Sequence, residues 1–242
     1  MRKIHILLIL VCLAAWGCAS LNPAQRAGFS FTVEPAANPW THLEFKNNPA
    51  DFQFAVISDR GGGERPGIFD KTMPKINLLQ PEFVMSVGDL MEGYSEDKNE
   101  VVRQWNELDG YVSQLEMPFF YVTGNHDYTN PMMAAYRQER HGRTYYHFVY
   151  QDVLFLIVNS EDPTEKRPNM TDEQNAYLAK ALRDNPDVRW TLCSCTGRYG
   201  RIRKYMAGQH LNRTFRGVRT RSLRVMSTTT RKTSGTDGNI TH

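Results

Sequence analysis

The sequence predicts an α/β fold, in which strands and helices alternate along the chain. Apolar, strand-like runs occur at residues 52–57, 83–87 and 117–122. Between them, residues 68–80 and 99–115 carry apolar side chains at helical spacing. This strand–helix–strand–helix–strand alternation is typical of α/β proteins. Each of the three strands ends in a polar loop that contains glycine, and in such sheets the loops after the strands form the site.

The length and composition set the limits of this fold. The chain has 242 residues, of which 40% are hydrophobic and 23% are charged. This is enough for one α/β domain and too little for two of full size. The composition excludes a wholly disordered or fibrous protein, and four cysteines exclude a scaffold built from disulfides.

The modest net charge of +3 is the sum of two unlike parts. Residues 193–242 contain 9 Arg, 2 Lys and a single acid, Asp237, which gives a net charge of +10. Residues 1–192 contain 18 basic and 25 acidic residues, which gives a net charge of −7. A break of this size near residue 193 requires its own explanation.

The first 17 residues are predicted to be an export signal. A positive start, Met1-Arg2-Lys3, precedes an almost wholly apolar run at residues 4–16. This run is long enough for a signal peptide and shorter than the roughly 20 residues that span a bilayer.

Its end, Ala15-Trp16-Gly17-Cys18, resembles the bacterial lipoprotein signal, which is cleaved before a cysteine that then carries lipid. Cys18 is therefore the expected lipidation site, and the mature protein is expected to be exported and anchored to the membrane. Trp16 fits this pattern poorly, so ordinary secretion into the periplasm with cleavage nearby is the alternative. Residues 18–50 are interpreted as a tether and lead-in because they contain several prolines in irregular sequence.

The rest of the body continues the α/β pattern. Thr171 and Gln174 have the spacing of a capping box at the start of a helix. The expected elements are a hairpin of strands at 144–148 and 153–158, a helix at 172–183 and a strand at 188–192.

The three polar loops contain Asp59, Asp89 and the run Asn125, His126 and Asp127. Carboxylate and amide oxygens beside an imidazole suit hard or borderline divalent metals. Each loop alone has an ordinary interpretation, because an Asp after a strand is commonly a cap and Gly-Asp is a common turn. Their repetition at successive strand ends favours a shared site.

These motifs resemble those of the calcineurin-like metallophosphoesterases. Gly88-Asp89 and Gly124-Asn125-His126-Asp127 match that family outright, and Ser58-Asp59 matches half of its first motif. The resemblance covers residues 51–192. It implies an α/β/β/α sandwich, incomplete at its C-terminus here, that hydrolyses phosphate esters with two metal ions of the Mn, Fe or Zn type.

The resemblance also implies a role for each residue. Asp59 would bind one metal ion, Asp89 would bridge both ions, and Asn125 would bind the second. His126 would lie over the phosphate as an acid or charge stabiliser, oriented by Asp127. The nucleophile in such sites is a metal-bound hydroxide, because the ions lower the pKa of water.

One departure concerns the first motif. The family has a histidine at the position of Gly61, so one nitrogen ligand is missing. Arg60 is a candidate substrate-binding residue, since guanidinium suits phosphate oxygens. The alternative is that Arg60 is only a solvated loop residue.

The larger departure is that the family's isolated His and its Gly-His-x-His motif are absent after residue 192. A one-base shift of the gene near codon 193 permits both motifs, in family order, with histidines that depend on the codons of Thr196, Met226 and Thr228. On this hypothesis residues 193–242 are a frameshift product. The chain then lacks three imidazole ligands and the last strands of its sheet, and is expected to be impaired or inactive.

Two other functions stay open. The chain could be a non-catalytic exported lipoprotein that keeps the fold as a binding module. Alternatively, its basic tail could bind polyanions such as anionic lipid. Export argues against nucleic acid as a partner, and the tail shows no nucleic-acid-binding motif.

Overall fold

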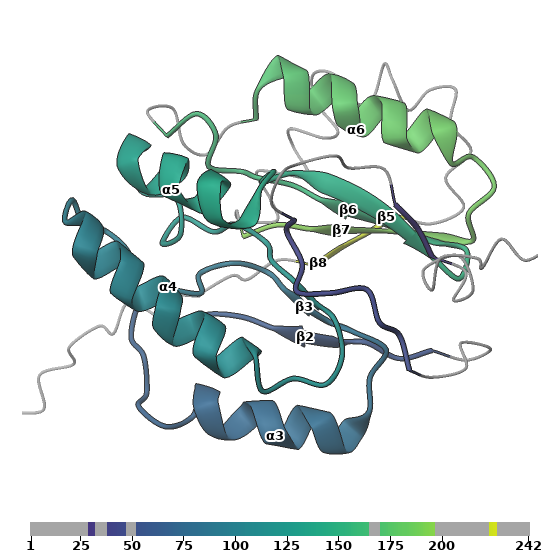
Figure 1. Cartoon of the computed structure of the whole chain (residues 1–242). Coiled ribbons are helices and arrows are strands. Elements are labelled where there is room, and N and C mark those ends of the chain that lie inside the picture. Colours follow the sequence, from purple (N-terminus) through teal and green to yellow (C-terminus); the bar gives the residue numbers. More distant parts are fainter. Residues whose placement is uncertain (1–28, 32–37, 47–51, 165–169, 197–222, 227–242) are drawn as a thin grey trace, which may run out of the picture.

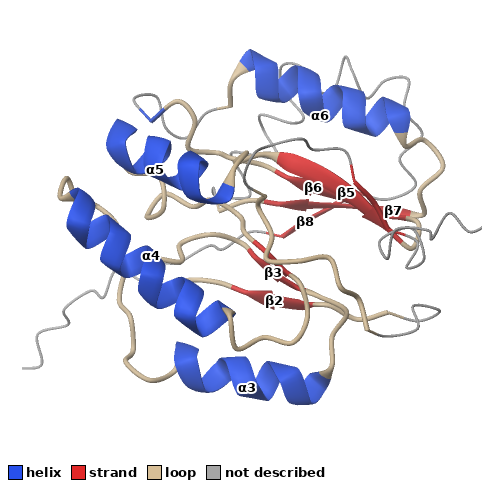
Figure 2. Cartoon of the chain, viewed as in Figure 1, coloured by secondary structure: helices blue, strands red, loops and turns tan. Residues whose placement is uncertain are grey.

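The computed structural model describes residues 29–31, 38–46, 52–164, 170–196 and 223–226 (Figure 1). Two sheets lie face to face at the centre, and helices cover their outer faces (Figure 2). This arrangement confirms the predicted α/β/β/α sandwich. The predicted signal peptide with Cys18, and most of the lead-in and basic tail, lie outside the described residues. Among the described helices, none has the length and apolar character needed to cross a membrane.

The first sheet consists of three parallel strands in the order β2-β3-β4. Its strands are shorter than the predicted runs, because the flanking backbone groups bond to other segments instead of the neighbouring strand. The N–H of Tyr121, directly after β4, for example, donates to the Pro39 carbonyl. Two predicted helices pack on its outer face and bury Met73 and Trp105 against it. The bounds are β2 Ala55–Ile57, α3 Phe69–Leu79, β3 Val84–Ser86, α4 Lys98–Val112 and β4 Phe119–Phe120.

The second sheet has five strands in the order β1-β5-β6-β7-β8. The predicted hairpin is confirmed: β5 and β6 are antiparallel and are joined by Gln151 and Asp152, both with positive φ, as a tight hairpin turn requires. Helix α6 then leads to β7, which pairs with β6 in parallel. The bounds are β1 Phe29–Phe31, β5 Tyr146–Tyr150, β6 Val153–Ile157, α6 Asp172–Asp184, β7 Trp190–Ser194 and β8 Leu223–Met226.

The expectation that the last strands of the sheet are missing is wrong in part. Strand β7 continues through Ser194, and β8 pairs with it in parallel, with Ser194 opposite Met226. The change in charge near residue 193 is therefore not a structural boundary. The backbone of β8 covers the edge of β7 that was expected to stay open.

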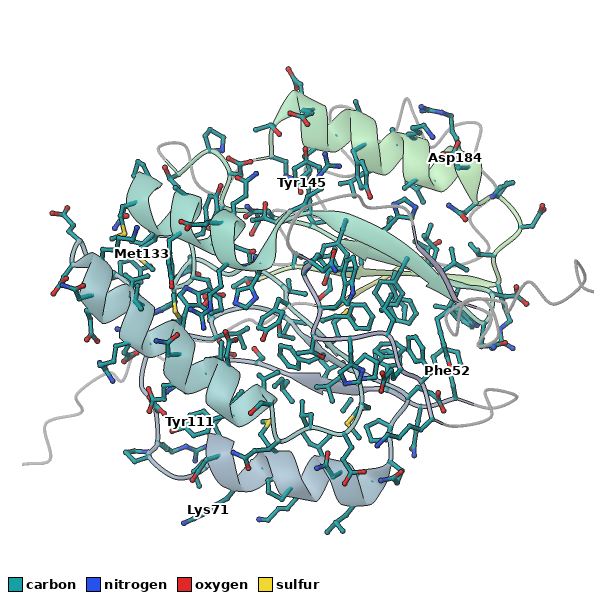
Figure 3. The ribbon with its side chains drawn as sticks, in the orientation of Figure 1. Phe52, Lys71, Tyr111, Met133, Tyr145 and Asp184 are labelled. Atoms are coloured by element: carbon teal, nitrogen blue, oxygen red, sulfur yellow. The ribbon has the colours of Figure 1, made fainter. Side chains whose placement is uncertain are left out.

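The core between the two sheets is mainly aromatic (Figure 3). Phe120 stacks on Phe148 with 4.4 Å between ring centroids, and Phe148 stacks on Phe155 at 4.7 Å. Phe83 meets these rings edge-on from the first sheet. Each buried Phe contributes about 1.5–3 kcal/mol, so this core fixes the two sheets against each other.

Two local features differ from the sequence expectation. Thr171 caps α6 as predicted, since its side chain accepts from the Gln174 N–H. The reciprocal half of the capping box is absent, because the Gln174 side chain bonds both backbone groups of Asn159 instead. Helix α5 (Pro131–His141) was not predicted; Asn130 caps it, and its proline stands in the first turn, where proline is tolerated.

Candidate active site

The three predicted loops meet at the carboxyl edge of the first sheet. Asp59 follows β2, Asp89 follows β3, and Asn125 and His126 follow β4. The His126 N–H donates to Asp89 Oδ1 at 3.0 Å, and the Gly61 N–H donates to the Asp89 carbonyl at 2.8 Å. The structure therefore brings the predicted metal-binding residues together, as parallel strand ends require.

Asp89 is the central group of this edge. Its side chain is buried, and burial is the main cause that raises its pKa above the ordinary value of 3.8. The hydrogen bond from the His126 N–H lowers the pKa, whereas the charge of Asp59 raises it. Two carboxylates close enough to repel each other form a site that a cation would stabilise.

Position 196 lies directly against this centre. A Cβ atom added to Gly124 would stand 2.3 Å from the Asp89 nitrogen and 2.8 Å from Thr196 Oγ1, so only glycine fits there. The Thr196 hydroxyl donates to the Val87 carbonyl at 2.5 Å. Hydrogen bonds of this kind join the end of β7 to the end of β3, and they place residue 196 among the metal-binding loops.

Two residues that sequence reasoning did not single out complete the site. The Asn125 Nδ2 group donates to the Tyr94 hydroxyl at 2.9 Å, and the Tyr94 ring meets the His126 ring edge-on. His126 Nδ1 lies 2.6 Å from the Glu92 carbonyl, and the Glu92 carboxylate accepts from the Gly62 N–H. The only sequence signal for Tyr94 and Glu92 is their place in the loop after Asp89.

The predicted role of Asp127 is corrected by its contacts. Asp127 is fully buried, and its carboxylate accepts N–H groups from Leu90, Met91 and Gly124 at 2.9–3.1 Å. Burial first, and then the charge of Asp89, raise its pKa to about 7. Asp127 therefore fixes the loop backbones, whereas the Glu92 carbonyl orients the ring of His126.

Arg60 is buried and is therefore not the solvated loop residue of the alternative interpretation. Its side chain is buried, and its guanidinium donates to the Leu90 carbonyl in the loop after β3 at 3.3 Å. It also pairs with Glu107 of α4 at 2.8 Å and with Glu64 of its own loop at 3.2 Å. Its guanidinium also lies over the ring of Tyr111, which Figure 3 labels on α4. Arg60 therefore anchors the first loop through these contacts, and it also lines the pocket beside Asp59.

The backbone around Gly61 leaves no room for the side chain of a histidine. A Cβ atom on Gly61 would lie 1.6 Å from the Met91 carbonyl oxygen. No side chain fits in this backbone arrangement, so the loop has closed onto the Asp89 loop where the family carries an imidazole ligand.

The described residues fit part of a metal centre. Asp59 and Asp89 supply carboxylates, and no hydrogen bond of the described residues uses the amide oxygen of Asn125. Within the described ranges, however, no group of three or more His, Cys, Asp or Glu side chains could hold an ion. The oxygen donors of the site are present, and the nitrogen donors are not among the described residues.

A pocket of about 280 Å³ opens beside Asp59, between the loop after β2 and helix α3. Ser58, Asp59 and Arg60 are among its polar lining residues, and Ile68 and Phe69 contribute apolar surface. Because Asp59 belongs to both the pocket and the metal-binding edge, a ligand could occupy both at once.

Comparison with known proteins identifies the class. The sequence model of the calcineurin-like phosphoesterase family matches residues 52–192, which is more than half of the chain. The chain therefore belongs to this family, whose members hydrolyse phosphoesters with metal ions held in a binuclear centre.

Similar proteins include one curated relative and one solved structure. An uncharacterized metallophosphoesterase of Campylobacter jejuni is 27% identical over 88 residues, which is 36% of this chain and 22% of that protein. A purple acid phosphatase from seeds of yellow lupin (Lupinus luteus) matches with a TM-score of 0.48 and 15% identity, over 69% of this chain and 36% of that one. The matched part thus spans only a minor share of either relative.

Proposed function

We propose that the complete gene product is an exported, metal-dependent phosphoesterase and that the 242-residue chain is an impaired form of it. The observation that carries this proposal is the meeting of Asp59, Asp89, Asn125 and His126 at one sheet edge, from the motifs of the family. The pocket beside Asp59 offers space for the organic group of a phosphate ester.

In this proposal Asp59, Asp89 and Asn125 hold the ions, which supply a hydroxide nucleophile near neutral pH when bound. Because a carbonyl oxygen only accepts, the short contact with Glu92 places a proton on His126 Nδ1. The Nε2 atom of the neutral ring is then unprotonated. His126 can thus donate a proton to a leaving group from Nε2 only as the imidazolium, a form that a phosphate anion stabilises.

Two structural observations support a frameshift in the gene. Thr196 packs against the Asp89 and Gly124 loops, and Met226 ends β8 directly beside the end of β7. The shifted frame permits histidine at both positions, which lie at strand ends beside the loops that carry the oxygen donors. The family match also ends at residue 192.

The test is to express two proteins, the 242-residue chain and a form with one base restored near codon 193. We expect the restored protein to contain metal by elemental analysis and to hydrolyse phosphate esters, and the 242-residue chain to do neither. Robust metal-dependent turnover by the 242-residue chain would refute the frameshift.

A second candidate, a non-catalytic binding module, is favoured by the missing three-residue metal group in the described part. It predicts that genomic DNA around codon 193 offers no single-base change that restores the histidines. It also predicts no metal in protein purified from the native source.

Membrane anchoring is proposed from the apolar run that ends in Gly17-Cys18. Cys18→Ser should release the protein from the membrane fraction, and mass spectrometry should find lipid on wild-type Cys18 only. Equal membrane retention of both forms, without lipid on either, would exclude the lipid anchor.

A further inference from the structure

The most anomalous polar group of the described residues is Arg137 on helix α5. Its side chain is fully buried, and none of its three guanidinium nitrogens has a hydrogen-bond partner in the described part of the chain. Its one cationic contact is with the ring of Trp105, whose centroid is 5.9 Å from the guanidinium carbon. Buried donors without acceptors are rare in folded proteins, because each costs about 1–3 kcal/mol, and more when charged.

Other buried polar groups around Arg137 share this property. The indole N–H of Trp105 has no hydrogen-bond partner among the described residues, and His141 Nε2 has no contact shorter than 3.6 Å, the distance to Asp109 Oδ1. The ring of His141 lies 4.7 Å from that of Trp105 by centroids. Trp105 on α4 and Arg137 on α5 are therefore neighbouring buried residues, and both have N–H donors without partners among the described residues.

No acidic side chain compensates the charge of Arg137 by contact. Asp127 acts on it only at longer range, and both Asp127 oxygens already accept backbone N–H groups. Asp109 is engaged by Arg140 and by the Tyr121 hydroxyl. The region therefore contains an excess of donors together with an uncompensated positive charge.

We propose that Arg137 and Trp105 bind a monovalent anion of halide size inside the molecule. An anion accepts N–H bonds from both side chains and neutralises the guanidinium. A water molecule would meet the donors but would leave the buried charge uncompensated. This site is separate from the strand-end residues, and the proposal does not depend on phosphoesterase activity.

The first test locates the anion. Crystals of the full chain are soaked in bromide, and anomalous scattering is measured at the bromine edge. We expect a peak within hydrogen-bond distance of the Arg137 guanidinium and the Trp105 indole nitrogen. Water density there with no bromide peak would overturn the proposal, and this test needs no variant.

The second test measures linkage in solution. Thermal melting is compared in sodium chloride and in sodium gluconate at equal ionic strength, since gluconate is too large for an interior site. We expect a saturable rise of about 3–5 °C at a tenfold excess of chloride over its Kd. Arg137→Met should abolish this rise, whereas Arg103→Met, which removes an exposed arginine of α4, should keep it. Equal melting temperatures in the two salts would refute the anion site. If Arg137→Met does not fold, the bromide experiment decides.

Discussion

The two sheets differ at the edge where their parallel strands end. In the first sheet, β2, β3 and β4 are followed by Asp59, Asp89 and Asn125, all of which carry oxygen donors. In the second sheet, β7 is followed by Cys195 and Thr196, which supply a buried thiol and a hydroxyl. The two edges nevertheless touch, because the Thr196 hydroxyl bonds the Val87 carbonyl at the end of β3.

This comparison shows that backbone and hydroxyl contacts of the described residues hold the two edges together. Hydroxyl-to-carbonyl bonds and close glycine contacts join the edges, and neither requires a metal ion. The described part of the chain, which carries the oxygen donors, therefore has the fold of the family. Substitutions at the first edge and behind it test whether that edge alone supplies the groups that bind metal and act on the substrate.

The largest effect is expected at Asp89 in the frame-restored protein. Asp89→Asn keeps the size of the side chain and removes the charge at the centre of the edge. We expect loss of both bound metal and phosphoesterase activity, measured by elemental analysis and by phosphate release. The exposed Glu116→Gln is the control and should change neither. Full turnover with metal retained would exclude a bridging role for Asp89.

His126 should separate acid catalysis from metal binding. In the frame-restored protein, His126→Ala should keep its metal and lose about a hundred- to ten-thousand-fold in kcat, the usual contribution of a positioned proton donor. The loss should be smaller for p-nitrophenyl phosphate than for alkyl phosphates, because p-nitrophenolate needs little protonation to leave. Equal losses would indicate charge stabilisation instead, and loss of metal would make His126 a ligand.

The sequence predicted α3, α4, α6 and the β5–β6 hairpin because their apolar spacing and turns are local signals. It missed α5, whose start at Asn130-Pro131 resembles a turn. It did not predict the ion pair of Arg60 with Glu107, because Glu107 lies far along the chain and a local pattern carries no trace of such a contact. The site residues that directly follow strands could be predicted from the sequence. Tyr94 and Glu92 could not, because they join the site only through contacts between the loops after β3 and β4.

Asp127 should matter for stability even in the 242-residue chain. Asp127→Asn replaces one acceptor oxygen by an N–H donor that faces backbone N–H groups. We expect a loss of about 3 kcal/mol in the free energy of unfolding, measured by urea denaturation. Asp184→Asn, which alters an exposed carboxylate on α6, should change stability little. An unchanged midpoint for Asp127→Asn would mean that Asp127 does not hold the first edge together.

Arg60 should also act through stability and not through substrate binding. Arg60→Met leaves Glu107 and Glu64 without their buried partner. We expect the free energy of unfolding to fall by about 2 kcal/mol. This value is below that of a fully buried pair because both acids are partly exposed. In the frame-restored protein KM should stay within twofold of wild type. Arg65→Met, at the rim of the pocket, is the matched control for stability. A large rise in KM with unchanged stability would show that Arg60 binds the substrate.

An effect as large as that of Arg60→Met, but confined to acid pH, is expected from His141, which lies behind the first edge and stacks on Tyr121. Burial first, and then the charges of Arg137 and Arg140, lower its pKa from 6.5 to about 2. Between these values the unfolded chain binds a proton that the folded chain does not, so stability falls as the pH is lowered below 6.5. Lowering the pH from 7 to 5 should therefore reduce the free energy of unfolding by about 2 kcal/mol through His141. His141→Phe keeps the stacking and cannot titrate, so urea denaturation should show a shallower acid slope for this variant. An identical slope would mean that His141 takes up its proton in the folded state, and that the interior behind the first edge is open to water.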